Sequence, residues 1–173
     1  LAKKLGFDKS HVTWVTEAFN AAYTPGAKKF DFDINEVSYT ADRAKAVDFS
    51  NSYYDVQQSI IALKGSRIVK HHSPADLKTY QYGDQIGTTG LQYINTKIQP
   101  TKAPRVYNTL DAAVAALKAG LVDAIVVDTP TGQYMANYQI VKKHRALATQ
   151  VGQFPSVGEH FGLVFQKGSD RKS

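Results

Sequence analysis

The sequence predicts an α/β fold with a parallel sheet and two domains, and three features of the chain support this prediction. Strand-like and helix-like segments alternate regularly from residue 84 to residue 150, which is typical of a parallel sheet. Residues 121–128 form a nearly continuous apolar run, as expected of a strand buried on both faces. The segments on both sides of this region lack the alternation. We therefore expect the chain to leave one domain near Ala62, build a second, and return near Gly162 through a hinge of two crossing strands.

The composition limits the classes of protein to which the chain can belong. Its 173 residues, 43% of them hydrophobic, suffice for one ordinary domain or two small ones. The absence of cysteine excludes disulfides, thiol nucleophiles and thiolate metal sites. No apolar run approaches the roughly 18 residues that indicate a membrane-spanning helix.

The net charge of +6 permits attraction to nucleic acid or to anionic membrane surfaces. The basic residues are scattered, and the densest stretches are residues 63–72 and 141–145. Neither stretch interleaves basic with aromatic residues, as proteins that bind single-stranded nucleic acid do. We interpret both stretches as solvated faces and expect no nucleic-acid partner.

The segments outside the alternating region predict one helix end, one capped helix and several strands. Residues 1–6 are typical of the last turns of an amphipathic helix that stops at Gly6. This start, and an end without a closing element, predict a chain truncated at both ends. Thr40 is placed to cap a helix over the residues that follow it. Alternating apolar residues predict strands over 11–15, 28–38, 57–65 and 160–168.

In the alternating strand–helix region, residues that favour helix N-caps and helix C-termini mark the ends of the predicted helices. Thr109 and Gly120, for example, mark the start and the end of one helix. The predicted helices begin at Pro74 or span residues 88–98, 109–120 and 129–143. The predicted strands span residues 83–87, 104–108, 121–128 and 146–151.

Polar residues at two strand ends, together with one arginine, are the candidate ligand-binding groups. Thr88 and Thr89 follow one strand and Asp128 ends another, and ligands of open parallel sheets bind at the carboxyl ends of strands. Taken singly, Thr88 and Asp128 are better explained as helix caps. Arg43 is either a surface charge or a group that grips a carboxylate through two parallel hydrogen bonds. Taken together, the four residues match the carboxylate and the ammonium of an α-amino acid, because buried charges need partners.

The same residues lie in a series of motifs. Residues 30–66 contain an apolar run with aspartates, the step SYTADR, the triplet DFS, two tyrosines and a strand, and IGTTG, AALKAGLVDAIVVDTP and HFGLVFQKGS follow in order. This series resembles that of the periplasmic-type (type II) extracellular solute-binding proteins of polar amino acid ABC transporters, family 3, over essentially the whole chain. The resemblance implies a clamshell of two α/β lobes with parallel-rich sheets, joined by a two-strand hinge, with ligand between the lobes.

The resemblance also implies the extent of each lobe. Lobe 1 would comprise residues 1–62 and 162–173, and lobe 2 would comprise residues 63–161. Members of the family have a further strand and helix before this region and further helices after it, so lobe 1 is expected to be incomplete. A monomer is expected, or a dimer that exchanges elements if the truncation is real.

Each candidate residue receives a role from the resemblance. Arg43 is implied to hold the ligand's carboxylate, with help from Thr88 and Thr89. Asp128 is implied to hold the ammonium, and Phe19 to pack on the ligand. The segment implied to assist Asp128 contains Asn35, Glu36 and Ser38.

The implied function is the capture of a polar α-amino acid by the binding component of an ABC transporter, whose partner is the membrane permease. The protein would then be periplasmic or extracellular, with a lipid anchor in a Gram-positive cell. Two alternatives remain open: a sensor domain joined to a receptor, and a dehydratase-like enzyme with Glu36 as general acid. Neither a catalytic triad, metal-ligand spacing nor a glycine-rich phosphate motif occurs in the sequence. We therefore expect no catalytic residue, no metal and no cofactor.

Overall fold

The computed structural model describes residues 1–143, 145–155 and 157–170. Its chain divides into two compact units, of which unit 1 comprises Leu1–Tyr54 and Phe161–Ser173, and unit 2 comprises Asp55–His160. The boundaries fall within strands β2 (Tyr54–Asp55) and β10 (His160–Phe161), which pair with each other. The predicted first boundary near Ala62 is wrong, because the strand that contains Ala62 is the centre of a sheet in unit 2.

Strand β3 (Gln58–Leu63) is the central element of unit 2. It pairs antiparallel with β6 (Ala124–Asp128) on one side and with β9 (Ala148–Gln153) on the other. The parallel pairing predicted for the alternating region occurs between β4 (Gly83–Gln85) and β5 (Arg105–Tyr107) and at an isolated bridge from the segment before β4 to β6. The α/β class is therefore confirmed, but β9 joins the sheet through an antiparallel partner.

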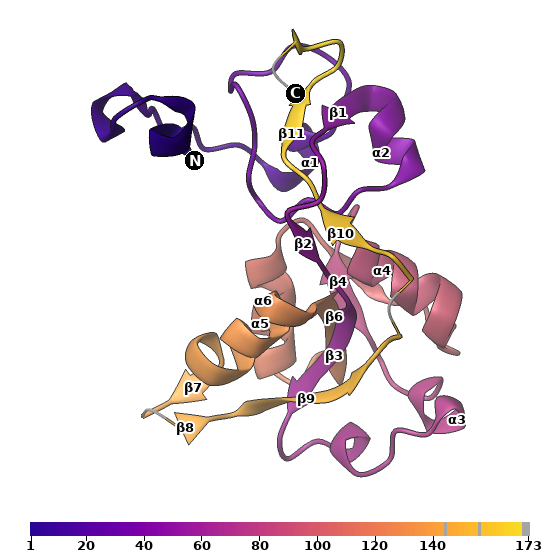
Figure 1. Cartoon of the computed structure of the whole chain (residues 1–173). Helices are drawn as coiled ribbons and strands as arrows, with labels where there is room; N and C mark the ends of the chain where they lie inside the picture. Colours follow the sequence, from indigo (N-terminus) through magenta and orange to yellow (C-terminus); the bar gives the residue numbers. More distant parts are fainter. Residues whose placement is uncertain (144, 156, 171–173) are drawn as a thin grey trace. The chain divides into compact units, whose positions relative to one another are not determined.

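Both faces of this sheet are covered, as Figure 1 shows, with α5 and α6 on one side and α4 on the other. Successive side chains of a strand point to opposite faces, so Ile61 belongs to one hydrophobic cluster and Ile60 to the other. The same division holds on β6, where Ile125 packs with the α5 and α6 side and Val126 with the α4 side. The strand predicted at 121–128 is thus buried on both faces over residues 124–127, whereas Leu121, before the start of β6, is 53% exposed.

The helices of unit 2 begin at residues that cap them. Thr88 accepts a hydrogen bond from Leu91 N, and Thr109 accepts one from Ala112 N. Ser73 forms a capping box with Asp76. The helical elements of unit 2 are η3 (Arg67–Val69), α3 (Pro74–Leu77), α4 (Thr89–Tyr93), η4 (Ile94–Ile98), α5 (Leu110–Lys118), α6 (Thr129–Tyr134) and η5 (Met135–Gln139).

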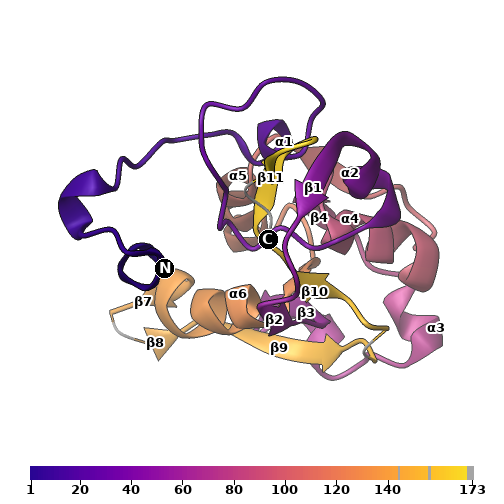
Figure 2. The ribbon, with the colours of Figure 1, turned by 45° about the horizontal axis from the view of Figure 1, so that its top comes forward.

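The predicted helix over 129–143 ends earlier than expected. It continues from α6 into the π-helical turn η5 and stops at Ile140. Two short strands, β7 (Val141–Lys142) and β8 (Arg145–Ala146), then form an antiparallel hairpin before β9. Figures 1 and 2 both show this hairpin at the start of β9.

Unit 1 contains little regular structure. Strands β1 (Val47–Phe49) and β11 (Val164–Gln166) pair antiparallel around a small core of Val37, Val47 and Val164. The helix predicted after Thr40 is α2 (Ala41–Ala46), and Thr40 caps it. The other helical elements are η1 (Ala2–Leu5), η2 (Lys9–His11) and α1 (Phe19–Ala22).

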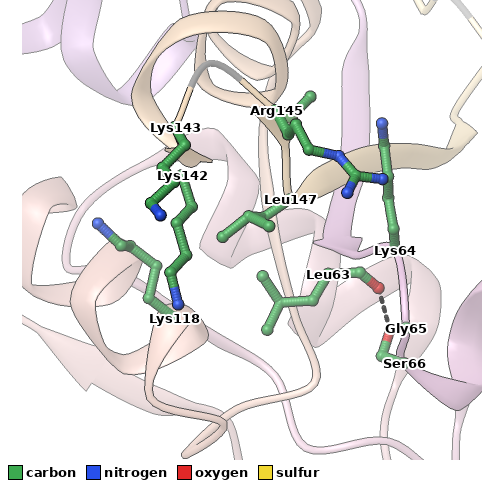
Figure 3. A pocket seen from close by; sticks show the side chains of 10 residues that line it. Leu63, Lys64, Gly65, Ser66, Lys118, Lys142, Lys143, Arg145 and Leu147 are labelled. Carbon is green, nitrogen blue, oxygen red and sulfur yellow. Dashed lines mark hydrogen bonds between the residues drawn. The ribbon is translucent and has the colours of Figure 1, made fainter.

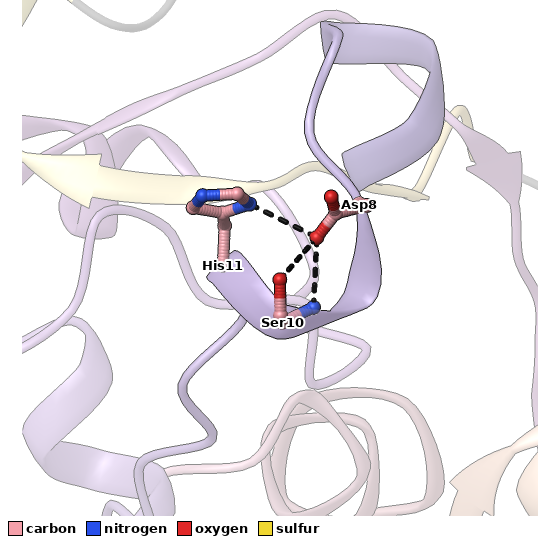
Figure 4. A network of polar contacts seen from close by, with 3 residues as sticks. All are labelled: Asp8, Ser10 and His11. Atoms are coloured by element: carbon pink, nitrogen blue, oxygen red, sulfur yellow. Dashed lines mark hydrogen bonds and ion pairs between the residues drawn. The ribbon is translucent and has the colours of Figure 1, made fainter.

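A local hydrogen-bond network fixes the start of η2. Asp8 accepts hydrogen bonds from the backbone N–H and the hydroxyl of Ser10, and its Oδ1 lies 3.0 Å from His11 Nδ1 (Figure 4). The hydrogen bonds, first that of the Ser10 hydroxyl, lower the pKa of Asp8. This network explains why the start of the predicted strand at 11–15 is helical instead.

Two of the predicted strands of unit 1 are wrong. Residues 12–18 have no regular structure, and Trp14 is 85% exposed. The alternating apolar side chains of this segment are therefore not packed against a core. Residues 28–38 make only isolated bridges, at Asp33 and at Ser38. Glu36 has a φ of 53°, which interrupts an extended chain. The final predicted strand, over 160–168, is likewise divided into β10 and β11.

Gly90 permits α4 to pack closely on β6. A Cβ atom at this position would lie 1.9 Å from Val126 O and 2.7 Å from Asp84 Oδ2. We predict that Gly90→Ala lowers the free energy of unfolding by about 1–3 kcal/mol or more, because α4 must move off the sheet. Urea denaturation would measure the change.

Gly152 in β9 provides the matched control, because no atom lies within 4 Å of the place that an added Cβ atom would take. Gly152→Ala should change the free energy of unfolding by no more than about 0.5 kcal/mol. Equal losses in the two variants would contradict the packing argument.

Candidate functional site

Arg43 is a buried cation in unit 1. It lies in α2, and its side chain is turned inward, with 8% exposure for the residue. Its Nη1 donates a hydrogen bond of 2.7 Å to the backbone carbonyl of Ser38. Its backbone N–H donates to the Thr40 hydroxyl, so the cap of α2 also fixes the position of Arg43. The surface-charge interpretation of Arg43 is therefore wrong for this structure, whereas its contact with a ligand stays a prediction.

Two aromatic rings lie beside the guanidinium group. Its Cζ is 4.3 Å from the ring centroid of Tyr23 and 5.6 Å from that of Phe19. The two rings contact each other edge to face and pack on the small core of unit 1. Cation–π contacts of this kind stabilise a buried guanidinium and fix its orientation. Phe19 and Arg43, predicted together, are thus neighbours.

The loop that leads to α2 holds the other predicted residues of unit 1. Ser38 is 2% exposed and contributes its carbonyl to Arg43. Asn35 and Glu36 are exposed, and Glu36 adopts the left-handed conformation described above. The structure therefore brings Ser38 to the arginine and leaves Asn35 and Glu36 on the surface of the loop.

In unit 2, one carboxamide joins three side chains. Gln58 is 1% exposed, and its Nε2 lies 2.6 Å from Asp128 Oδ1, 3.1 Å from Thr89 Oγ1 and 3.1 Å from Glu159 Oε1. These four residues, called here the acceptor cluster, come from β3, α4, the end of β6 and the segment before β10. The cluster contains two carboxyl groups and few donors, which suits a cationic partner.

Two oxygens of the acceptor cluster are buried without a hydrogen-bond partner among the described residues. They are Gln58 Oε1 and Glu159 Oε2. A buried acceptor without a donor costs free energy, so such atoms need an explanation. The neighbouring Tyr93 responds to this environment, because burial and then the Glu159 carboxylate raise the pKa of its hydroxyl.

Asp84 adds a third carboxyl group near the acceptor cluster. It is fully buried under α4, and burial raises its pKa well above the ordinary 3.8. Backbone N–H groups of Gln85 and Val126 act in the opposite direction, and the charge of Asp128 raises the pKa further. The protonated form is therefore favoured over a wider pH range than for an exposed aspartate.

The predicted strand-end residues take different positions. Thr89 and Asp128 both belong to the acceptor cluster. The hydroxyl of Thr88 caps α4 and donates to Gln85 O at 2.8 Å, so it is engaged within the protein. The cap interpretation is thus correct for Thr88, and a ligand contact of its hydroxyl stays a prediction.

Sequence reasoning missed Gln58, Glu159 and Tyr23. Gln58 could have been found as a polar residue at the start of the apolar strand QSIIAL. Tyr23 follows Phe19 at the four-residue spacing that places two side chains on one face of a helix. For Glu159 no local signal exists, because only the fold brings it to a strand 101 residues away.

No group of three or more His, Cys, Asp or Glu residues that could hold a metal ion occurs in the part of the chain that the structure describes. His144 lies outside the described residues. Among the described residues there is also no helix long and apolar enough to cross a membrane.

Comparisons with known proteins point to one family. The family description "Bacterial extracellular solute-binding proteins, family 3" matches residues 1–125. The L-arginine-binding protein of Pseudomonas aeruginosa is 27% identical over 164 residues, which cover 92% of this chain and 62% of that protein. The chain thus spans about three fifths of the length of this relative.

Solved structures agree with this match. An ancestral arginine-binding protein bound to arginine superposes with a TM-score of 0.74 at 32% identity, covering 96% of this chain and 70% of that one. The AvGluR1 ligand-binding domain in complex with methionine superposes with a TM-score of 0.65 at 28% identity, covering 80% and 56% of the two chains. The predicted fold is therefore confirmed.

The burial of Asp84 predicts a pH-dependent stability. Because its pKa is raised in the folded state, its contribution is complete below the ordinary pKa and is lost as the pH rises toward the raised value. Asp84→Asn does not titrate at this position, so its stability relative to the wild type should increase as the pH rises above about 4, by up to about 1.4 kcal/mol per pH unit. Urea unfolding at several pH values would measure this, and a constant difference would contradict it.

Asp8 is the matched control with the opposite sign. Its pKa is lowered by hydrogen bonds from Ser10, so its contribution is present above the ordinary pKa and lost as the pH falls. Asp8→Asn should therefore lose stability relative to the wild type at neutral pH and approach it in acid.

Proposed function

The chain belongs to the bacterial extracellular solute-binding proteins of family 3, and from this premise we propose that it is the amino-acid-binding part of an ABC transporter's substrate-binding component. It works outside the cytoplasm, in the periplasm or at the cell surface, with a lipid anchor if the cell is Gram-positive. Its partners are an amino acid and the membrane permease that receives it.

The observation that carries this proposal is the opposite charge of the two candidate sites. Unit 1 presents a buried guanidinium, held by Ser38 and by two aromatic rings. Unit 2 presents the acceptor cluster, with two carboxyl groups and two acceptor atoms that lack a donor among the described residues. An α-amino acid carries a carboxylate for the first site and an ammonium with three donors for the second.

The acceptor cluster also suggests the class of side chain. An α-ammonium neutralises one carboxylate, and Asp128 is the residue assigned to it. The second carboxylate, that of Glu159, is then available to a cationic side chain. Arginine is therefore the first candidate ligand, in keeping with the arginine-binding proteins among the similar proteins.

Capture follows from hinge closure. Ligand would bind first to one unit, and the second unit would close because it gains contacts only in the closed state. Strands β2 and β10, which contain both unit boundaries, are the segments that would bend. The permease would then recognise the closed form.

One alternative keeps a specific observation in its favour. The similarity to the AvGluR1 ligand-binding domain supports a sensor domain joined to a receptor, which would use the same ligand site. The dehydratase-like alternative loses support, because its candidate acid, Glu36, is exposed in a loop.

A calorimetric titration of the refolded protein with each of the twenty amino acids would test the proposal. Unfolding and refolding first removes any ligand carried through purification. We expect saturable binding of arginine and weaker binding of neutral amino acids. A folded chain that binds no amino acid would contradict the proposal, provided that a chain extended to the full length of its relatives also binds none.

Arg43→Ala should lower the affinity for the amino acid by about 2–5 kcal/mol, because the ligand's carboxylate loses its partner. The decarboxylated amine of the same ligand is the control. It should bind the wild type and the variant almost equally, since it brings no carboxylate to Arg43. Equal losses for both ligands would mean that the variant damages the fold rather than the carboxylate contact.

Asp128→Asn and Glu159→Gln should separate the two roles within the acceptor cluster. Asp128→Asn should weaken amino acids much more than their des-amino analogues, by about 2–5 kcal/mol. Glu159→Gln should weaken arginine more than glutamine. Calorimetric titration of both variants with arginine, glutamine and a des-amino analogue would measure these affinities. The same pattern of losses in the two variants would contradict separate roles.

A further inference from the structure

A second charged site lies in unit 2, at the opposite end of β3 from the acceptor cluster. The two most basic stretches of the sequence, far apart along the chain, meet there in an open pocket of about 840 Å³. The pocket is lined by Leu63, Lys64, Gly65, Ser66, Lys118, Lys142, Lys143, Arg145, Ala146 and Leu147. It is called here the basic pocket.

Three elements supply the cations of the basic pocket. Lys64 follows β3, and its backbone N–H donates to Leu147 O at 2.8 Å, which extends the pairing of β3 with β9. Lys118 is in the last turn of α5. The hairpin β7–β8 supplies the remaining cations, with Lys142 paired opposite Arg145. Backbone pairing therefore fixes the backbone positions of Lys64, Lys142 and Arg145, whereas their side chains are exposed.

The basic pocket has cationic walls and an apolar centre. Figure 3 shows Lys118 and Lys142 on one side, Lys64 and Arg145 on the other, and Leu63 and Leu147 between them. None of the lining residues is acidic. No ion pair of these lysines or of Arg145 occurs among the described residues.

Five cations without an acidic neighbour repel one another and attract anions. The hydroxyl of Ser66, the remaining polar side chain of the lining, already donates to Leu63 O at 2.7 Å. The pocket therefore offers charge and apolar surface, and few directional groups for a particular small anion. This combination matches an amphiphile that carries a phosphate group beside an apolar chain.

We propose that the basic pocket is a contact site for anionic phospholipids, through which unit 2 associates with a membrane surface. The lysines and Arg145 contact lipid phosphates, and the two leucines contact the apolar part of the lipid below the headgroup. The site lies apart from the acceptor cluster and does not depend on which amino acid the protein binds.

Nucleic acid is the other polyanion that such a pocket could attract. It would place phosphates and sugars, rather than hydrocarbon, against Leu63 and Leu147. The lining also contains no aromatic side chain on which a base could stack. The apolar centre therefore favours the lipid.

Co-sedimentation of the full chain with vesicles tests the proposal. We expect binding to vesicles of phosphatidylglycerol and phosphatidylcholine in equal amounts, little binding to phosphatidylcholine alone, and loss of binding as salt is raised. No binding to the anionic vesicles would overturn the proposal. Displacement by inorganic phosphate at constant ionic strength, or equally tight binding of duplex DNA, would assign the pocket to a free anion or to nucleic acid instead.

Matched charge variants separate the basic pocket from the net charge. The pocket variant combines Lys64→Gln, Lys118→Gln and Lys142→Gln. The control variant, which removes the same charge elsewhere in unit 2, combines Lys70→Gln, Lys97→Gln and Lys102→Gln. All six lysines are exposed, so both variants should fold.

Each cation close to an anionic surface contributes about fivefold to binding. The pocket variant should therefore bind anionic vesicles at least about tenfold, and up to about a hundredfold, more weakly than the wild type. The control variant should lose much less. Equal losses in the two variants would show that overall charge, and not the basic pocket, attracts the membrane.

Discussion

The structure of unit 2 depends on a strand that is both the centre of its sheet and the support of its candidate site. Strand β3 is held by β6 on one side and β9 on the other, so the position of Gln58 at its first residue is fixed by two ladders. From there one carboxamide reaches α4, the end of β6 and the segment before β10. The two N–H groups of this carboxamide lie within hydrogen-bond distance of three acceptors in different elements and so align those elements with one another. The acceptor cluster is therefore as rigid as the sheet that supports it.

This arrangement has an electrostatic cost. Two carboxyl groups share one carboxamide, and a third, that of Asp84, lies buried close by. Three oxygens of these four groups, counting Asp84, lack a hydrogen-bond donor among the described residues: Gln58 Oε1, Asp84 Oδ2 and Glu159 Oε2. Removing charged groups from water is unfavourable unless each group is paired with an opposite charge and its hydrogen bonds are satisfied. In the function that we propose, a cationic ligand would supply the missing donors, so the feature that lowers the stability of the empty site would raise the affinity for the ligand. In unit 1, the aromatic rings beside Arg43 support its buried guanidinium group through cation–π contacts.

The sequence predicted best where local and long-range forces agree. The helix after Thr109 and the cap at Thr40 have strong periodic or capping signals, and the structure contains both. The apolar run predicted as a strand at 121–128 forms the buried strand β6 from Ala124 onward. The strand predicted at 28–38 is wrong, because the segment makes only isolated bridges at Asp33 and Ser38 and the left-handed conformation of Glu36 lies between them. Periodicity does not report φ. Of the residues predicted through spacing and resemblance, Arg43 lies beside Phe19, and Thr89 and Asp128 lie in the acceptor cluster. Their contacts with a ligand stay predictions. Gln58 and Glu159 were not, because their meeting is decided by the order of strands in the sheet.

The two charged regions of unit 2 are separated along one strand. Gln58 begins β3 and Lys64 follows its end, which places them about 20 Å apart at 3.3 Å per residue. That distance is about two and a half Debye lengths at physiological salt, so the basic pocket does little to neutralise the acceptor cluster. Each region can therefore attract its own partner: the acceptor cluster a cation, and the basic pocket an anionic surface. The net charge of +6 does not indicate two regions of opposite charge, because they form only when β3 and its neighbours fold.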